Sequence, residues 1–481
     1  MNTPTPPFAH YQNLINGQWV DSQETIDVEN PATGQTIGTI ASALPAHVDA
    51  AVKAARDCHD QRLMLSMSPY ERMQLLHRIA KQLRVEAKRG GMLLCLENGK
   101  PLSQAEWEFE EAARYFEYYA GMADKLEGKS IPLGDGYVDF TEYEPFGVSA
   151  QIIPWNFPVS LVARSLAPAL AAGNAVVIKS PELTPLAITI VGEALMKANV
   201  PKGAVNILCG YGSSTGAALV SHSGIDQIVF TGSVPTGQAI MQAAINHVIP
   251  CVMELGGKSA GIVFADADLD QVVDSAQVGN LYNSGQVCSA MARLIVHESV
   301  YDELKQRLVA CFESKRVGDG LNEADVTPIL TQAQLNKIAS MCAHAQQQGA
   351  AIITGGTALE GPGYFMPPTV IEADVASDIA QQEVFGPVLV LMKFTTSDEA
   401  FEMANATEFG LVAGVFTKDL NQALTASRKL VAGQIFVNEW FAGGISTPFG
   451  GVGKSGFGRE KGQEALYNYV RTKNIAIRLD C

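Results

Sequence analysis

Val148-Ser149-Ala150-Gln151-Ile152-Ile153 is the first of four short apolar runs that decide the expected fold. The other three runs are residues 175–178, 204–208 and 227–230, and a segment long enough for a helix separates each run from the next. This alternation is typical of a parallel sheet whose strands are joined by crossover helices. We therefore predict an α/β fold.

The C-terminal half, from residue 260 to about residue 456, repeats the alternation. Its predicted strands are residues 294–296, 351–353, 369–371, 389–392, 414–416 and 434–437. A chain of 481 residues is also too long for one simple domain. We therefore predict a second unit built around a parallel sheet.

Residues before this region read as helices and short strands. Leu14 to Val20 predicts a hairpin around Asn16-Gly17, and apolar residues at helical spacing predict helices between residues 44 and 87. Residues 104–122 predict a further helix, whose acidic start suits the positive end of its dipole. We interpret its aromatic stripe as core packing. The acidic residues are Glu106, Glu108, Glu110 and Glu111, and the stripe is Trp107, Tyr115, Phe116, Tyr118 and Tyr119.

Two segments are expected to leave the main body. Residues 130–144 have the alternation of a hairpin, and the tail at residues 474–479 alternates like an edge strand. An exposed edge invites pairing with another subunit. We therefore predict a role for these segments in assembly.

Composition narrows the functional classes. The 34 basic and 50 acidic residues leave a formal charge of -16, which argues against nucleic-acid binding. The eight cysteines lack paired spacing and indicate reduced thiols in a cytoplasm rather than disulfides or a metal site. Residues 1–10 do not resemble a signal peptide, and Arg164, Pro168 and Gly173 interrupt the most apolar region, which excludes a membrane span there.

One cysteine stands in a context that suggests catalysis. Tyr282-Asn283-Ser284-Gly285-Gln286-Val287-Cys288-Ser289 is a polar turn that contains glycine, and Glu254 lies upstream in Glu254-Leu255-Gly256-Gly257-Lys258. A thiolate attacks a carbonyl carbon, and a carboxylate activates the water that releases the thioester. A helix N-terminus would lower the thiol pKa and favour the thiolate. The alternative is that Cys288 is a buried small hydrophobe, as most single cysteines are.

No standard nucleotide fingerprint is present. Gly-x-Gly-x-x-Gly is absent, and residues 210–216 come close with one residue too many, which we interpret as a loop between a strand and a helix. Gly453-Lys454-Ser455 lacks the upstream glycine of a phosphate-binding loop. Residues 230–237 place a glycine turn between a strand and a helix, where free N–H groups would meet a pyrophosphate.

Taken together, the chain resembles the hydrolytic, NAD(P)-dependent class of the aldehyde dehydrogenase superfamily from about Leu14 to Leu479. The resemblance rests on separated motifs in one order. They are Pro154-Trp155-Asn156-Phe157-Pro158, Lys179-Ser180-Pro181-Glu182, Phe230-Thr231-Gly232-Ser233, Glu254-Leu255-Gly256-Gly257-Lys258, Gly285-Gln286-Val287-Cys288, Glu383-Val384-Phe385-Gly386-Pro387 and Pro448-Phe449-Gly450-Gly451.

The resemblance implies two Rossmann-like parallel-sheet domains and a small bridging β unit that joins subunits into a homodimer or homotetramer. Residues 1–123 and 146–255 would form the NAD-binding domain, residues 256–456 the catalytic domain, and residues 124–145 and 457–481 the bridging unit. Cys288 would form a thiohemiacetal with the aldehyde, Asn156 and the Cys288 N–H would hold the oxyanion, and Glu254 would activate water.

The resemblance also implies a cofactor site and no metal. Lys179 and Glu182 would hold the adenosine ribose, Gly232 and Ser233 the pyrophosphate, and Glu383 and Phe385 the nicotinamide ribose and ring. The remaining residues implied at the cofactor are Ile153, Pro154, Trp155, Gly212, Gly216, Phe230, Thr231 and Leu255. Because the Glu182 carboxylate would repel a 2′-phosphate, we expect NAD to be preferred over NADP.

The expected substrate is a small polar, hydroxylated or carboxylated aldehyde, as in relatives that resemble lactaldehyde or succinate semialdehyde dehydrogenases. Arg164 would stand at the substrate tunnel, where relatives that act on apolar aldehydes usually place an aromatic residue; the alternative is a structural salt bridge. Tyr282 takes the place of a second arginine in succinate semialdehyde enzymes. Trp440 and Phe441 would narrow the pocket. The candidate substrate residues are Phe157, Arg164, Tyr282, Val287, Ser289 and Phe449.

Two other functions remain open at this point. The same fold would also suit aliphatic or aromatic aldehydes, which a substrate panel would distinguish. A protein from another class, such as a non-catalytic NAD-binding or structural protein, would have no reason to keep Cys288, Glu254 and Asn156 together.

Overall fold

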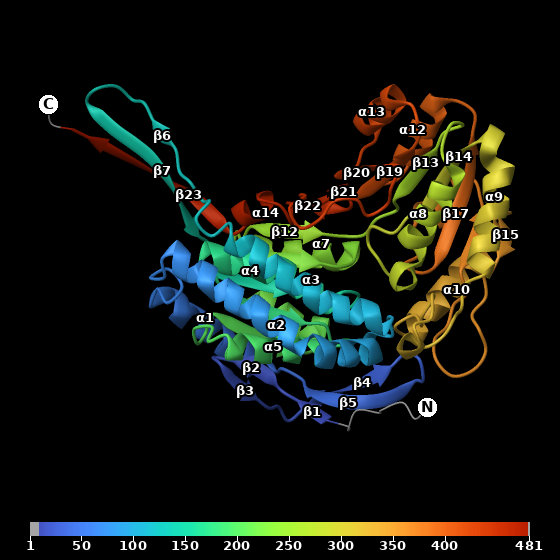
Figure 1. The fold of residues 1–481 in the computed structure, drawn as a ribbon. Coiled ribbons are helices and arrows are strands. Elements are labelled where there is room, and N and C mark those ends of the chain that lie inside the picture. The colour runs from blue at the N-terminus through green and yellow to red at the C-terminus, as the bar shows by residue number, and fades with distance from the viewer. Residues whose placement is uncertain (1–8, 480–481) are drawn as a thin grey trace.

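The computed structural model describes residues 9–479 and contains two large sheets, each covered by helices, with a separate strand arm (Figure 1). The α/β fold class is therefore confirmed. The predictions for residues 1–8, which concern a signal peptide, and for Cys481 lie outside the described residues.

The first sheet has eight strands in the order β22-β12-β11-β8-β9-β10-β2-β3. Its five central strands are parallel, while β22, β2 and β3 join antiparallel. The bounds are β22 Gly456–Phe457, β12 Cys251–Glu254, β11 Gln227–Thr231, β8 Val148–Ile152, β9 Ala175–Ser180, β10 Val205–Cys209, β2 Asn13–Ile15 and β3 Gln18–Val20. The four runs predicted from the sequence are all strands of this sheet.

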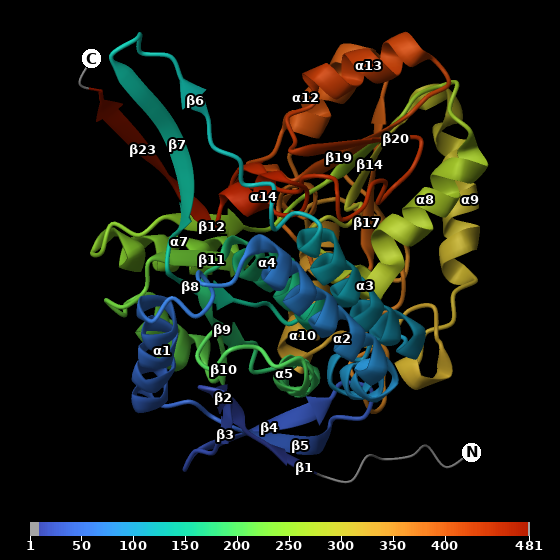
Figure 2. The same ribbon diagram turned by 60° about the vertical axis from the view of Figure 1, so that its left-hand side comes forward.

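Helices cover both faces of the first sheet, as Figures 1 and 2 show. They are α1 Pro45–Asp60, α2 Pro69–Asn98, α3 Leu102–Ala120, α4 Pro158–Ala172, α5 Leu186–Lys197, α6 Ala217–Val220 and α7 Val234–Ile245, with a π-helical turn, η1, at Gly212–Gly216. The α2 helix runs well beyond the predicted residue 87, because its face stays apolar through Leu93 and Leu94. Ser68 and Glu71 form a capping box at its start.

The second sheet has seven strands in the order β15-β16-β17-β14-β13-β19-β20, all parallel except β15, which pairs antiparallel with β16. The bounds are β15 Ala351–Thr354, β16 Thr369–Glu372, β17 Val388–Phe394, β14 Arg293–His297, β13 Ala260–Val263, β19 Val412–Phe416 and β20 Gln434–Val437. All six predicted strands are present. The seventh, β13, was not predicted, although it is completely buried in the middle of the sheet.

The helices and turns of the C-terminal half are α8 Leu269–Leu281, η2 Tyr282–Gly285, α9 Glu298–Glu313, η3 Gly320–Asn322, α10 Gln332–Gln347, α11 Asp378–Gln381, α12 Ser397–Asn405, α13 Leu420–Lys429 and α14 Glu464–Tyr467. Buried apolar residues on the two faces of the second sheet form two separate core clusters. The largest cluster lies around the first sheet.

The strand arm consists of β6 Ser130–Ile131, β7 Tyr137–Pro145 and β23 Val470–Arg478, in the order β23-β7-β6. Figures 1 and 2 both show it projecting from the body, with the end of β23 near its tip. The predicted hairpin and edge strand are therefore present and pair with each other. Two small sheets complete the fold, formed by β1 Ala9–Tyr11, β5 Gln35–Ala41 and β4 Thr25–Asn30, and by β18 Phe409–Gly410 and β21 Val452–Gly453.

Candidate active site

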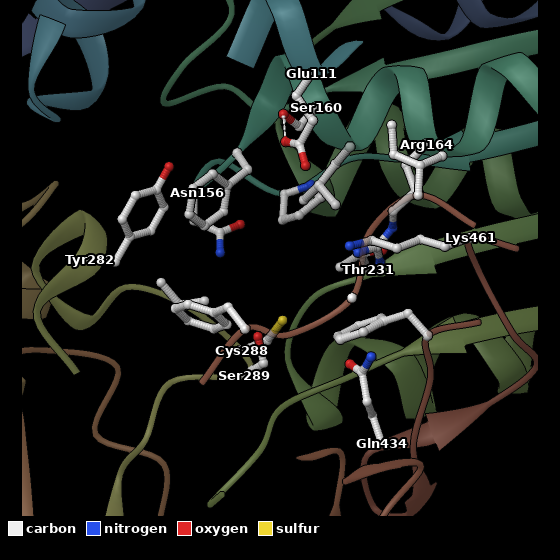
Figure 3. A pocket seen from close by; sticks show the side chains of 18 of the residues that line it. Glu111, Asn156, Ser160, Arg164, Thr231, Tyr282, Cys288, Ser289, Gln434 and Lys461 are labelled. Carbon is white, nitrogen blue, oxygen red and sulfur yellow. Dashed lines mark hydrogen bonds between the residues drawn. The ribbon is translucent and has the colours of Figure 1, made fainter. Parts of the chain in front are cut away.

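A cavity of about 1010 Å³ collects residues from both halves of the chain. Its wall includes Cys288 and Asn156, together with all six candidate substrate residues. Figure 3 shows Cys288 and Ser289 on one side and Asn156, Ser160 and Arg164 on the other. The fold thus brings together motifs that are far apart in the sequence.

A strained turn presents Cys288 to this cavity. Asn283 and Ser284 have φ angles of 48° and 55° within η2, and Gly285 follows at 73°. A Cβ on Gly285 would lie 2.2 Å from the Gly386 carbonyl oxygen, so only glycine fits there. Ser284 Oγ donates to the Thr327 carbonyl at 2.8 Å and fixes the turn.

The expectation that Cys288 gains from a helix N-terminus is wrong. Cys288 follows η2 in irregular backbone, after α8 has ended at Leu281. Burial raises the pKa of the Cys288 thiol to about 11, and the positive charge of Arg164 acts in the opposite direction. The resting thiol is therefore protonated near neutral pH, and its activation depends on nearby charge.

Asn156 is held from three sides. Its side-chain Nδ2 donates to the Gln286 carbonyl at 3.0 Å, next to the cysteine turn. Its own carbonyl accepts from Lys100 Nζ at 2.8 Å and from Asn283 Nδ2 at 3.1 Å. The amide is therefore fixed relative to the loop that carries Cys288.

Lys100 and Glu108 form a buried ion pair behind Asn156. Their side chains are 0% and 2% exposed, and Glu108 Oε2 also accepts from the N–H groups of Val159 and Ser160 at 3.2 Å each. Glu108 therefore accepts hydrogen bonds from N–H groups in the first turn of α4. The prediction that Glu108 interacts with the dipole of its own helix, α3, is wrong. Sequence reasoning missed Lys100.

Glu254 ends β12 and is 2% exposed. Neither of its carboxylate oxygens has a hydrogen-bond partner among the described residues. Burial, followed by repulsion from Glu460, raises its pKa well above the usual range. Glu254 does not border the cavity in this conformation, and a Cβ on Gly450 would lie 2.7 Å from its Oε1.

The candidate cofactor residues divide into two groups. Those that line the cavity are Pro154, Trp155, Thr231, Gly232, Ser233, Leu255, Glu383 and Phe385. The rings of Trp155 and Phe385 meet edge to face at 5.3 Å, and Glu383 accepts from the Gly257 N–H at 3.0 Å. The residues that do not line it are Ile153, Lys179, Glu182, Gly212, Gly216 and Phe230.

Lys179 and Glu182 are paired with each other, since Lys179 Nζ lies 2.5 Å from Glu182 Oε2 at the end of β9. The 210–216 segment is not a simple loop, because residues 212–216 form η1 and lead directly into α6. The helix after the 230–233 motif begins at Val234, and the Ser233 side chain caps it by accepting from the Thr236 N–H. Pro235 has no N–H, and the N–H groups of Thr236 and Gly237 both bond to Ser233, so the positive end of the α7 dipole, rather than a set of free N–H groups, lies beside Gly232.

Aromatic rings form part of the aldehyde side of the cavity. Phe157 and Tyr282 stack at 5.9 Å with an interplanar angle of 9°, and Phe441 meets Tyr282 at 6.3 Å. Trp440 was expected to narrow the pocket, but it is buried and donates from Nε1 to the Ser289 carbonyl at 3.0 Å. That expectation is wrong for Trp440, which instead supports the cysteine loop from behind.

The predicted core stripe on α3 is also only partly correct. Tyr115, Phe116 and Tyr119 are buried in the core, as predicted. Trp107 and Tyr118 line the cavity, because α3 passes directly beside it, and the buried Tyr115 also contributes to its wall. Glu111, from the same helix, lines it as well and accepts from Ser160 Oγ at 2.6 Å (Figure 3).

Arg164 lines the cavity and is at the same time part of a buried ion pair with Glu460. Ser165 Oγ donates to the other Glu460 oxygen at 3.0 Å, and the Arg164 guanidinium lies 5.1 Å from the centre of the Phe449 ring. Both interpretations of Arg164 thus describe part of its environment. Sequence reasoning missed Glu460 and its neighbour Lys461, whose side chain also lines the cavity.

A comparison with protein-family models matches residues 19–475 to the aldehyde dehydrogenase family. The chain belongs to this family. An aldehyde dehydrogenase oxidises aldehydes to carboxylic acids, so the enzyme is an oxidoreductase, and the sequence-based recognition of the superfamily is confirmed.

This aldehyde dehydrogenase is similar along its whole length to characterised relatives. It is 41% identical to aldehyde dehydrogenase family 2 member B4, mitochondrial, from Arabidopsis thaliana, over 99% of this chain and 90% of that protein. It is 40% identical to human retinal dehydrogenase 2, over 99% and 93%. The solved structure of an NAD-dependent aldehyde dehydrogenase from Sinorhizobium meliloti superimposes with a TM-score of 0.98 at 35% identity, over 99% and 97% of the two chains.

The seven cysteines within residues 9–479 are all free. In the same range, no group of three or more His, Cys, Asp or Glu side chains is placed to hold a metal ion. None of the helices in the described part of the chain is both long and apolar enough to cross a membrane.

Proposed function

We propose that this aldehyde dehydrogenase uses NAD to oxidise a small polar, hydroxylated or carboxylated aldehyde through a thioester on Cys288. The observation that carries the proposal is the composition of one cavity wall. Cys288 and Asn156 share this wall with Arg164, Lys461 and the Ser160 hydroxyl. The groups for carbonyl attack thus face the same space as groups that bind polar or anionic substituents.

The first step is attack of Cys288 Sγ on the aldehyde carbon, which moves negative charge onto the carbonyl oxygen. A side-chain amide has two N–H donors, and the Gln286 carbonyl takes one from Asn156. The second Asn156 N–H and the backbone N–H of Cys288 are then the donors for the oxyanion. Such a preorganised donor contributes about 10²–10³ in rate.

Charge near the thiol sets its reactivity. The Cys288 proton must leave before attack, and the Arg164 guanidinium favours the thiolate that remains. Bound NAD would accept the hydride released when the thiohemiacetal becomes a thioester. Glu254, once deprotonated, would then take a proton from water as the water attacks the thioester, which releases the acid and restores the thiol.

The residues around α7 fit a dinucleotide. Thr231, Gly232 and Ser233 open onto the cavity at the start of this helix, where the positive end of the helix dipole suits a pyrophosphate. The absence of a side chain at Gly256 leaves room for Glu383, because a Cβ at this position would lie 2.6 Å from Glu383 Oε2. These residues would hold the pyrophosphate and the nicotinamide half.

Lys179 and Glu182 would bind the adenosine ribose, and the Glu182 carboxylate supports a preference for NAD over NADP because it would repel a 2′-phosphate. The remaining cofactor residues proposed from the sequence, Ile153, Gly212, Gly216 and Phe230, would act from behind the cavity wall. The similarity to the NAD-dependent aldehyde dehydrogenase from Sinorhizobium meliloti supports the same cofactor.

Assembly and location are part of the same proposal. The exposed edge of β23 and the projecting arm support pairing with another subunit, in a homodimer or homotetramer. Free cysteines support a reducing cytoplasm. The proposal includes the domain division, with residues 1–123 and 146–255 for NAD, 256–456 for catalysis, and 124–145 and 457–481 for assembly.

A second candidate is an enzyme for aliphatic or aromatic aldehydes. Two observations favour it: Glu460 already pairs with Arg164, and Phe157, Tyr282 and Phe441 form an aromatic wall. The relative named retinal dehydrogenase 2 points the same way. The decisive experiment is kcat/KM with NAD for lactaldehyde, glycolaldehyde and succinate semialdehyde against hexanal and benzaldehyde. Higher values for the polar set support the proposal, and higher values for hexanal or benzaldehyde replace it with the second candidate.

A further inference from the structure

Two cationic side chains reach the aldehyde cavity beside the same aromatic ring. The Arg164 guanidinium lies 5.1 Å and the Lys461 ammonium 5.4 Å from the centre of the Phe449 ring, and all three residues line the cavity. Figure 3 shows the labelled Arg164 and Lys461 side chains converging on one part of the pocket. Their roles differ because their partners differ.

The charge of Arg164 is already balanced. It forms the buried ion pair with Glu460, whose second oxygen accepts from Ser165. A substrate carboxylate that bound Arg164 would have to compete with this internal partner. Arg164 therefore offers little free binding capacity to an anion.

Lys461 has no such partner. No hydrogen bond or ion pair to its ammonium group occurs within residues 9–479. Burial lowers the pKa of Lys461, and the Glu111 carboxylate is the strongest opposing influence. Glu111 lies in the same cavity but beyond ion-pair distance, and it accepts from Ser160 Oγ.

The backbone holds Lys461 in place. The preceding residue, Glu460, exchanges backbone hydrogen bonds of 2.6 and 2.7 Å with Phe449, and the N–H of the following Gly462 donates to the Ile445 carbonyl at 2.7 Å. Lys461 itself has a φ of 59°, in the left-handed region. This conformation costs energy for a residue with a Cβ, and it aims a cation into the cavity from a fixed loop.

We propose that Lys461 is the residue that binds the carboxylate of the substrate, and that the preferred substrate is an aldehyde with a carboxylate at its far end. This inference rests on the proposed function, since it names the anchor in the same cavity. Glu111 then tunes the site, because its negative charge opposes an incoming carboxylate. The two residues should affect selectivity in opposite directions.

The test compares Lys461→Met and Glu111→Gln with the wild-type enzyme. Both substitutions remove one charge with little change in side-chain size. The readout is the ratio of kcat/KM for succinate semialdehyde to that for butanal, an uncharged aldehyde of the same chain length. We expect Lys461→Met to lower this ratio by about 10- to 100-fold, mainly through KM, because a charge-assisted hydrogen bond is lost. Glu111→Gln should raise the ratio, and Lys461→Arg should keep part of the wild-type preference for succinate semialdehyde.

Lys454→Met is the matched control. Lys454 is exposed, pairs with Glu408 and does not line the cavity, so its substitution should leave the ratio unchanged. A ratio that stays constant in Lys461→Met, while the wild-type enzyme still prefers succinate semialdehyde, would overturn the role of Lys461 alone. A wild-type preference for butanal would overturn the proposed substrate class itself. A lowered ratio in Glu111→Gln would contradict the electrostatic explanation.

Discussion

Arg164 and Glu460 form a buried ion pair at the wall of the cavity that contains Cys288. The two residues come from α4 and from the loop before α14, so the pair joins the first sheet's helices to the C-terminal segment. The charges of this pair also act on both candidate catalytic groups, Cys288 and Glu254. Arg164 favours the Cys288 thiolate, whereas Glu460 disfavours the ionised form of Glu254.

The substitution Glu460→Gln should therefore separate the effect of Glu460 on Glu254 from the effect of Arg164 on Cys288. Removal of one partner from a buried pair should lower the free energy of unfolding by about 3 kcal/mol or more. The pKa of Glu254, which burial and Glu460 raise, should fall towards its usual value. Because the ionised form of Glu254 acts as the base, the pH at which thioester hydrolysis reaches half its maximal rate should move to lower pH. Single-turnover hydrolysis rates measured against pH would show this, and a shift to higher pH would contradict it.

The pH profile of the wild-type enzyme should follow the Cys288 thiol. Burial raises its pKa to about 11, and only the thiolate attacks. In the absence of bound cofactor, the rate of Cys288 alkylation should rise by up to about tenfold per pH unit through the range below that pKa. Iodoacetamide labelling followed by mass spectrometry measures this rate. A plateau already reached near neutral pH would show that the thiolate is favoured in the resting enzyme.

The ion pair between Lys100 and Glu108 should support both stability and catalysis. Lys100→Met leaves Glu108 buried without its partner, which should cost about 3–5 kcal/mol in urea unfolding. The double variant Lys100→Met/Glu108→Leu removes the second charge and should recover much of that stability. Its kcat should stay low, because the Asn156 carbonyl has lost one of its two donors and the first turn of α4 has lost its acceptor. Full recovery of kcat in the double variant would show that the pair has no part in holding Asn156.

Cofactor preference should depend on Glu182. In the wild-type enzyme, kcat/KM should be higher with NAD than with NADP, because the carboxylate would repel the 2′-phosphate. Glu182→Ser removes this repulsion and should reduce the ratio of NAD to NADP activity by about tenfold or more. Glu193→Ser is a control, because this carboxylate of α5 pairs with Arg89 and Lys197 and does not contact Lys179. Equal activity with both cofactors in the wild-type enzyme would show that the preference is absent.

The sequence predicted most of the framework because its signals are local. Apolar runs of strand length alternate with helix-length segments, and this pattern requires no knowledge of distant contacts. The very short strands, such as β22, and the buried β13 lacked a distinct pattern. The catalytic candidates were equally accessible, since Cys288, Glu254 and Asn156 each lie in a short motif with its own glycines or prolines.

The charges that tune the site were not predictable in this way. Glu460 and Lys461 lie in a loop near the C-terminus, and nothing around them indicates that the loop returns to α4. Lys100 precedes a proline and looks like an ordinary surface lysine, although it is completely buried. Trp440 stands next to Phe441 in the sequence, yet only Phe441 reaches the cavity. Each of these assignments depends on tertiary packing.

The central claim is that the reaction passes through a thioester on Cys288, and the Glu254→Gln variant tests it most directly. The variant should be mixed with NAD and succinate semialdehyde, quenched with acid and analysed by intact-mass and peptide mass spectrometry. We predict a single burst of NADH, close to one per active site, and an acyl group attached to Cys288, because the base for hydrolysis is missing. Steady turnover at the wild-type rate with no acyl group on Cys288 would contradict the account.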